Sequence, residues 1–157
     1  MSDKTGSLIA AAALFGAKMS GTSSEVQVTL TEFGERIGAA FQLSDDIIDI
    51  ASETGESGKT PGTDLREGVP TLPTLIALRS TDAGSERLRA LLSKPLTDDS
   101  EHAEALRLLR AHPAMQESRS YVQAETDAAS ALLSRLPNVP ARGALQALCD
   151  TVATRLA

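Results

Sequence analysis

The sequence predicts an all-α protein, and three features of its composition support this. Apolar residues make up 41% of the 157 residues, and the helix formers Ala and Leu dominate that set. Aromatic residues make up only 3%, Trp is absent, and Val and Ile, which favour strands, are few. The charged fraction of 23% is typical of globular proteins, so we expect a single helical domain over residues 1–157.

The first expected helix covers residues 1–19 and is rich in Ala. Gly6 and Gly16 within it are small enough to let another backbone approach. Gly21 suits the left-handed residue that follows many helices, so the helix is expected to end just before it.

A second, long helix is expected over residues 22–52, because Thr22 and Glu25 have the spacing of a capping box and no proline follows them. The next stretch, residues 53–70, contains four glycines and two prolines. That composition predicts a loop, and a loop of this length in a compact domain is usually functional or disordered.

Residues 71–157 are expected to form further helices separated by prolines. Pro73 suits the first turn of a helix, and Thr97 or Asp98 can cap a helix that ends before Pro113. The closing helix has apolar residues three and four positions apart, namely Leu145, Leu148, Val152 and Leu156. The whole pattern is that of a helical array.

Charge and cysteine content exclude several classes of function. The net charge of -6 and the lack of a Lys/Arg-rich run argue against nucleic-acid binding. Cys149 is the only cysteine, which excludes an internal disulfide and a cysteine-based zinc site. The apolar stretch 8–14 is too short to span a bilayer and does not resemble a signal peptide. We therefore expect a cytoplasmic protein with no integral membrane segment.

Three carboxylates near the end of the second expected helix point to metal chemistry. Asp45 and Asp49 share one face, because a helix turns by about 100° per residue, and Asp46 lies beside Asp45. Like charges one turn apart repel, and no Lys or Arg lies near enough in sequence to offset them. Mg²⁺ is commonly held by one or two carboxylates while phosphates and waters complete its shell. These residues therefore predict a Mg²⁺ site, with a solvated helix surface as the alternative.

The loop that follows carries a cation suited to an anionic ligand. Lys59 lies between Gly58 and Gly62, with Asp64 and Arg66 shortly after. A cation among glycines on a loop is suited to bind and cover a phosphate. The alternative is an ordinary exposed lysine.

Taken together, these motifs resemble those of the trans-isoprenyl diphosphate synthases, also called polyprenyl synthetases. The resemblance covers essentially the whole chain and corresponds to the C-terminal half of that family. The matching elements are Lys4-Thr5-Gly6-Ser7-Leu8, then Phe41-Gln42 with Asp45-Asp46-x-x-Asp49, then Gly58-Lys59-x-x-Gly62-x-Asp64-Leu65-x-Glu67-Gly68, and Thr71-Leu72-Pro73.

The resemblance implies an enzyme of isoprenoid biosynthesis with the isoprenoid synthase fold. Family members join an allylic prenyl diphosphate to isopentenyl diphosphate, with Mg²⁺ and basic residues stabilising the departing diphosphate. By this resemblance Asp45 would bind Mg²⁺ directly, and Asp46 and Asp49 would support it through water or indirectly. Lys4 and Lys59 would contact the allylic diphosphate.

The resemblance also implies roles for residues near the reacting carbons. Lys4, Thr5 and Gln42 are the expected catalytic residues, and Phe41 is expected in the pocket for the isopentenyl unit. One departure is visible, because Val69 stands where many relatives carry a second lysine.

The first aspartate-rich motif of the family, and the basic residues that bind isopentenyl diphosphate, have no counterpart here. Asp98 and Asp99 do not replace that motif and are better explained as a helix cap, and His102 and His112 are expected at the surface. We therefore expect this chain to be catalytically incomplete alone. Isopentenyl diphosphate would bind through the missing N-terminal half, and the full-length protein is expected to be a homodimer.

Two other functions remain open from the sequence. The chain can be a non-catalytic helical subunit or remnant that binds Mg²⁺ and diphosphate, or that binds a partner chain. A class I terpene cyclase is a third alternative, although its Asn/Ser/Glu metal motif is not seen in the sequence.

Overall fold

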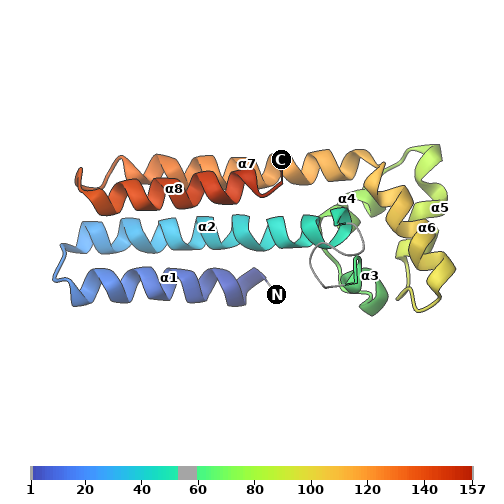
Figure 1. Cartoon of the computed structure of the whole chain (residues 1–157), viewed down its shortest axis with the longest axis horizontal. Helices are drawn as coiled ribbons and strands as arrows, with labels where there is room; N and C mark the ends of the chain where they lie inside the picture. The colour runs from blue at the N-terminus through green and yellow to red at the C-terminus, as the bar shows by residue number, and fades with distance from the viewer. Residues whose placement is uncertain (1, 53–59, 157) are drawn as a thin grey trace. The chain divides into compact units, whose positions relative to one another are not determined.

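The computed structural model describes residues 2–52 and 60–156, with side chains from Thr5 onward in the first helix. All regular elements within these ranges are helices, which confirms the all-α prediction (Figure 1). No helix in the part described is both long and apolar enough to cross a membrane. The elements are α1 (Ser2–Met19), α2 (Ser24–Ala51), α3 (Thr63–Glu67), α4 (Leu72–Arg79), the 3₁₀ turn η1 (Ala83–Ser85), α5 (Glu86–Leu92), α6 (Asp99–Arg110), α7 (Pro113–Leu133) and α8 (Pro140–Thr154).

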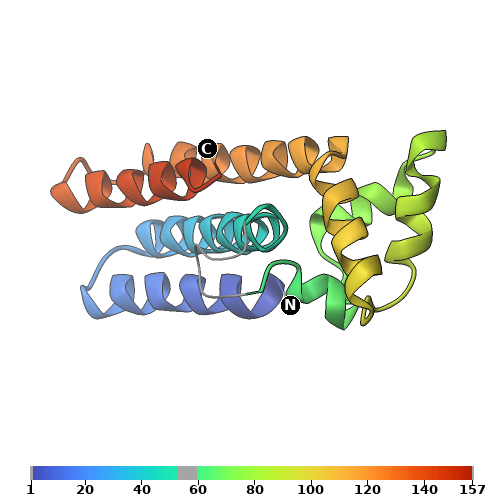
Figure 2. The ribbon, with the colours of Figure 1, turned by 45° about the vertical axis from the view of Figure 1, so that its right-hand side comes forward.

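The packing divides the chain into two compact units, and each is described by itself. The first unit consists of Met1–Ser44 and Tyr121–Ala157, and the second of Asp45–Ser120. In the first unit α1 runs antiparallel beside α2, and α8 runs antiparallel beside α7 (Figure 1 and Figure 2). The expected single domain over residues 1–157 stays a prediction.

Each unit has its own core, because its helices are apolar on one side and polar on the other. In the first unit the largest fully buried apolar side chains are Phe33, Ile37, Val122 and Val152. In the second unit the corresponding set is Ile47, Ile50, Leu88, Leu91, Leu96 and Leu109.

Small residues bring the backbones of α1 and α2 into direct contact. A Cβ atom on Gly38 would lie 2.6 Å from the Cα of Gly6, and one on Gly34 would lie 2.6 Å from the Cα of Ala10. Real Cβ atoms do not approach other atoms this closely, so only glycine fits at both positions of α2. The close approach expected at Gly6 is confirmed, whereas the one expected at Gly16 is wrong, since nothing lies within 4 Å of a Cβ there.

The turn between α1 and α2 differs from the expected capping box. Gly21 takes the left-handed conformation (φ 67°), as expected for the residue after a helix. Thr22 donates its hydroxyl to the carbonyl of Ala17 at 3.0 Å, and thus closes α1. The hydroxyl of Ser23, and not that of Thr22, accepts a hydrogen bond from an amide of α2, that of Val26 at 3.5 Å. The helix α2 therefore begins at Ser24, one residue later than a cap at Thr22 predicts.

The described part of the expected loop contains a short helix. Residues 53–59 lie outside the described ranges, but α3 occupies Thr63–Glu67. The side chain of Leu65 in α3 is only 4% exposed, and this burial stabilises a helix of five residues that would not form alone. Gly62 and Gly68 flank α3 with φ values of 71° and 70°.

The two histidines have structural roles, and the expectation of surface positions is wrong for His102. Its side chain is 4% exposed, and its Nε2 lies 2.9 Å from the carbonyl oxygen of Gly62. His112 is half-buried, with its Nε2 2.9 Å from the hydroxyl of Ser85. The expected cap at Asp98 is confirmed, because its carboxylate accepts from the amides of Ser100 and Glu101 at 2.9 and 3.0 Å.

The contact between α1 and α2 predicts opposite effects for two Gly→Ala substitutions. Gly38→Ala should destabilise the protein by about 1–3 kcal/mol, because the added methyl group overlaps the backbone of Gly6. Gly16→Ala, the control, should stabilise it by up to about 1 kcal/mol through helix propensity alone. Urea unfolding measures both, and a Gly38→Ala variant as stable as the wild type would contradict the close contact.

The cap of α6 predicts a pH-dependent stability. Hydrogen bonds from the Ser100 side chain and from the backbone lower the pKa of Asp98, so its stabilisation is present above the ordinary carboxylate pKa and is lost as the pH falls below it. Asp98→Asn retains an oxygen acceptor but cannot titrate. We therefore expect the stability advantage of the wild type over this variant to shrink between about pH 5 and pH 3, measured by thermal unfolding. A constant difference would show that the carboxylate charge plays no part.

Candidate active site

Three aspartates occupy the half-exposed side of the last two turns of α2. Asp45, Asp46 and Asp49 are half-exposed, whereas Ile47 and Ile50 between and beyond them are fully buried. The apolar residues fix the rotation of the helix in the second unit, and that rotation leaves the carboxylates accessible.

The carboxylate of Asp49 joins the end of α2 to the start of α3. Its two oxygens accept hydrogen bonds from the backbone amides of Thr63 and Asp64, each at 3.3 Å. The backbone carbonyl of Asp49 also accepts from the amide of Gly62 at 2.8 Å. The first amides of a helix have no partner within it, so Asp49 supplies acceptors that α3 needs.

Negative charge is concentrated around this junction. The pKa of Asp64 is raised, first by burial and then by the charges of Asp49, Asp46 and Glu67. A raised pKa means that the surroundings disfavour one more negative charge. A bound cation would offset this repulsion.

Two side chains from α6 hold the segments on either side of Asp49. Arg110 donates from Nε to the carbonyl of Ile50 at 2.7 Å and from Nη2 to that of Ser52 at 2.6 Å. These bonds satisfy carbonyls that the end of α2 leaves free. His102 contacts the carbonyl of Gly62, where the chain returns to α3. Neither residue was identified from the sequence, because each lies 40 or more positions from its partner.

The first unit contains the other predicted site residues. The hydroxyl of Thr5 on α1 donates to the side-chain carbonyl of Gln42 on α2 at 3.1 Å, in a partly buried position. The structure thus brings together two residues that are 37 positions apart in the sequence. Their proximity follows from the close approach of α1 and α2, since Gly6 directly follows Thr5 and Gly38 lies one helical turn before Gln42.

Phe41 has a cationic neighbour that the sequence did not reveal. The guanidinium carbon of Arg155 lies 4.4 Å from the centroid of the Phe41 ring, a cation–π distance. Arg155 also donates from Nη1 to the hydroxyl of Ser44 at 3.1 Å. It follows α8 and is 111 positions from Ser44, so no local pattern could have indicated this contact.

The predicted diphosphate ligands lie outside the part described. Lys59 falls within residues 53–59, and the side chain of Lys4 precedes the first described side chain. Their roles therefore stay predictions. The structure groups Thr5 with Gln42 in the first unit, and Asp49 with Asp64 in the second.

The oxygen ligands present are of the type that Mg²⁺ prefers. Among the described side chains, no group of three or more His, Cys, Asp or Glu lies close enough to hold an ion. Mg²⁺ needs only one or two carboxylates when phosphate and water complete its shell, and Asp45, Asp46 and Asp49 fit that chemistry.

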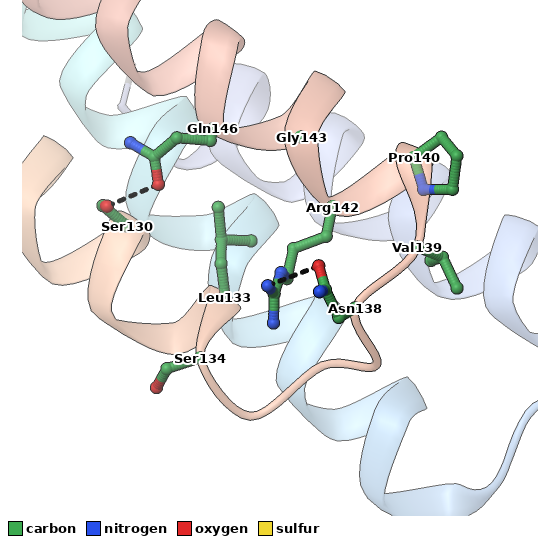
Figure 3. A pocket seen from close by; sticks show the side chains of 9 residues that line it. All are labelled: Ser130, Leu133, Ser134, Asn138, Val139, Pro140, Arg142, Gly143 and Gln146. Carbon is green, nitrogen blue, oxygen red and sulfur yellow. Dashed lines mark hydrogen bonds between the residues drawn. The ribbon is translucent and has the colours of Figure 1, made fainter.

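A separate pocket of about 740 Å³ lies where α7 and α8 meet in the first unit (Figure 3). None of the predicted site residues lines it. Ser130 donates to the side-chain carbonyl of Gln146 at 2.7 Å, and Arg142 donates to that of Asn138 at 2.6 Å. Its polar side chains thus bond to one another, which makes this pocket a weaker candidate for the site.

Comparison with known proteins identifies relatives of the whole chain. The chain is 50% identical over 153 residues to the nonaprenyl diphosphate synthase of Mycobacterium tuberculosis, covering 98% of this chain and 46% of that protein. It is 32% identical over 155 residues to the octaprenyl diphosphate synthase of Escherichia coli, covering 97% of this chain and 47% of that enzyme. The chain thus spans about half the length of the curated relatives it matches.

Solved structures show the same fold. The geranylgeranyl pyrophosphate synthase of Corynebacterium glutamicum, crystallised with calcium and isoprenyl diphosphate, has a TM-score of 0.91 and is 42% identical. That match covers 99% of this chain and 48% of the other. The family model described as "Polyprenyl synthetase" matches residues 1–109. The chain therefore belongs to the polyprenyl synthetase family.

Proposed function

We propose that this chain carries the allylic-diphosphate half of a site for prenyl transfer to isopentenyl diphosphate. The observation that carries the proposal is the acidic end of α2, where Asp49 is bound to the start of α3, in a chain of the polyprenyl synthetase family. In this reaction the allylic C–O bond breaks and its electron pair leaves with the diphosphate. The alkene of isopentenyl diphosphate then attacks the carbocation, and a proton is lost. The main task of the protein is to stabilise the departing negative charge.

Mg²⁺, when bound, supplies most of that stabilisation by neutralising the diphosphate oxygens. Asp45 is proposed as its direct ligand, with Asp46 and Asp49 supporting it. The hydrogen bonds of Asp49 to α3 support an indirect role for this residue, since both its oxygens already accept from amides. The relative from Corynebacterium glutamicum, crystallised with calcium and isoprenyl diphosphate, further supports a divalent cation here.

Thr5 and Gln42 are proposed to face the carbocation, where the partial negative charges of their oxygens favour positive charge. Lys4 and Lys59 are proposed to bind the allylic diphosphate, and Phe41 to line the pocket for the isopentenyl unit.

We further propose that the chain needs another helical partner segment to complete turnover. Leu8, Phe15 and Met19 on α1 are 62%, 63% and 88% exposed, and their spacing places them along one side of the helix. Exposed apolar stripes of this kind are typical of interaction surfaces. The exposed apolar stripe on α1 also favours the second candidate function, a non-catalytic subunit that binds Mg²⁺ and diphosphate.

The metal assignment predicts that diphosphate binding depends on both Mg²⁺ and Asp45. Calorimetric titration with geranyl diphosphate should show binding with Mg²⁺, and Asp45→Ala should weaken it about tenfold or more, since one charged ligand is worth at least about 1.4 kcal/mol. Asp127→Ala, on the surface of α7, is the control and should bind like the wild type. Equal affinity with Asp45→Ala would sink the proposed metal site.

The proposed incompleteness predicts binding without turnover. The isolated chain, incubated with Mg²⁺, geranyl diphosphate and radiolabelled isopentenyl diphosphate, should form no longer prenyl product. Adding a separately expressed N-terminal half of the Mycobacterium tuberculosis relative should restore product formation if the chain is the catalytic half. Product from the isolated chain would contradict incompleteness, and no product from the mixture would favour the non-catalytic subunit.

A further inference from the structure

The second unit contains a basic pocket that the proposed prenyl transfer does not use. It has a volume of about 310 Å³ and lies between the start of α3 and one side of α6. We call it the arginine pocket, and its polar lining consists of Thr60, Arg66, Asp99, His102, Arg107 and Arg110.

The charges in the arginine pocket are unbalanced, although the chain as a whole has a net charge of -6. Three guanidinium groups line it, against the single carboxylate of Asp99, which pairs with Arg66 at 2.8 Å. Two other acidic residues of α6 form ion pairs with residues outside the pocket. Glu101 pairs with Lys94 and Glu104 pairs with Arg87, each at 2.6 Å. Among the residues that line the pocket, guanidinium groups therefore outnumber carboxylates by three to one.

Many hydrogen-bond donors in the pocket are still available. Arg110 uses Nε and Nη2 on the carbonyls of Ile50 and Ser52, and its Nη1 makes no hydrogen bond with the described residues. Arg107 makes neither a hydrogen bond nor an ion pair within the described part of the chain. It does lie near a carboxylate, because the pKa of Glu104 is lowered first by its hydrogen bond with Arg87 and further by the charges of Arg87 and Arg107. A guanidinium group presents five N–H donors in a planar fork that matches phosphate oxygens. Within the described residues, two guanidinium groups with unbonded N–H donors thus line one small pocket.

The lining also limits the kind of ligand. The apolar part consists of Pro61, Ala103 and Leu106, which offers little surface for a prenyl chain. A compact oxyanion is better matched, because it needs donors and positive charge more than apolar contact.

We propose that the arginine pocket binds inorganic phosphate or diphosphate without Mg²⁺, at a site separate from the acidic end of α2. Arg107 supplies the free fork, and Arg110 and Arg66 supply further charge. Because Arg110 also holds the carbonyls of Ile50 and Ser52, an anion here acts on the residues directly after Asp49.

The test measures anion binding to the whole chain in the presence of EDTA. Calorimetry with sodium phosphate and sodium diphosphate at constant ionic strength should detect binding, and sodium chloride should give none. Arg107→Ala should weaken binding about tenfold, the effect of losing one charged hydrogen-bond pair, and Arg107→Lys should weaken it less. Whichever of phosphate and diphosphate binds more tightly identifies the preferred anion.

A matched variant tests whether the loss of any exposed arginine has the same effect. Arg79→Ala removes an arginine of α4 that is exposed like Arg107 but lies outside the pocket, and it should leave the affinity unchanged. Circular dichroism of each variant checks that the helices remain intact.

Several outcomes would overturn the proposal. They are the absence of binding in EDTA, equal losses with Arg107→Ala and Arg79→Ala, and binding that disappears with Lys59→Ala but persists with Arg107→Ala. The two proposals also fail separately. Unchanged Mg²⁺-dependent binding by Asp45→Ala overturns the proposed function alone, whereas unchanged Mg²⁺-free binding by Arg107→Ala overturns the arginine pocket alone.

Discussion

The hydrogen bonds between the Asp49 carboxylate and the first amides of α3 are the constraint on which the second unit depends. They tie the end of a long helix to a helix of five residues, which lacks the length to be stable alone. Burial of Leu65 and the contact of His102 with Gly62 hold the same junction from the other side. A carboxylate on a helix is therefore both a structural acceptor and part of the candidate metal site.

In the first unit the corresponding constraint is steric: the backbones of α1 and α2 are in direct contact. Gly6 and Gly38 allow two backbones to touch, and this contact sets the distance between Thr5 and Gln42. The hydrogen bond between Thr5 and Gln42 thus depends on two glycines that have no side chain, one directly after Thr5 and one a helical turn before Gln42. The pocket between α7 and α8 contributes less to the candidate site, since its polar groups bond to one another.

Much of the helical pattern could be predicted, because it depends on neighbours within a few residues. The cap at Asp98 and the left-handed Gly21 follow from local rules, and the structure confirms both. Thr22 was assigned to the wrong helix, since its hydroxyl can serve either end of the turn and the sequence does not rank the two. The short helix α3 was missed within a glycine-rich stretch, because its stability comes from the burial of Leu65 and not from propensity.

By itself the sequence determined the fold class, the polyprenyl synthetase motifs and the carboxylates of Asp45, Asp46 and Asp49, since composition and short spacings encode all three. Only the tertiary structure decided that His102 is buried against Gly62, that Arg110 caps α2, and that Arg155 lies over Phe41. Each of these contacts joins residues 40 or more positions apart. Such pairs meet because core packing fixes the helix faces, and no local pattern records which faces will meet.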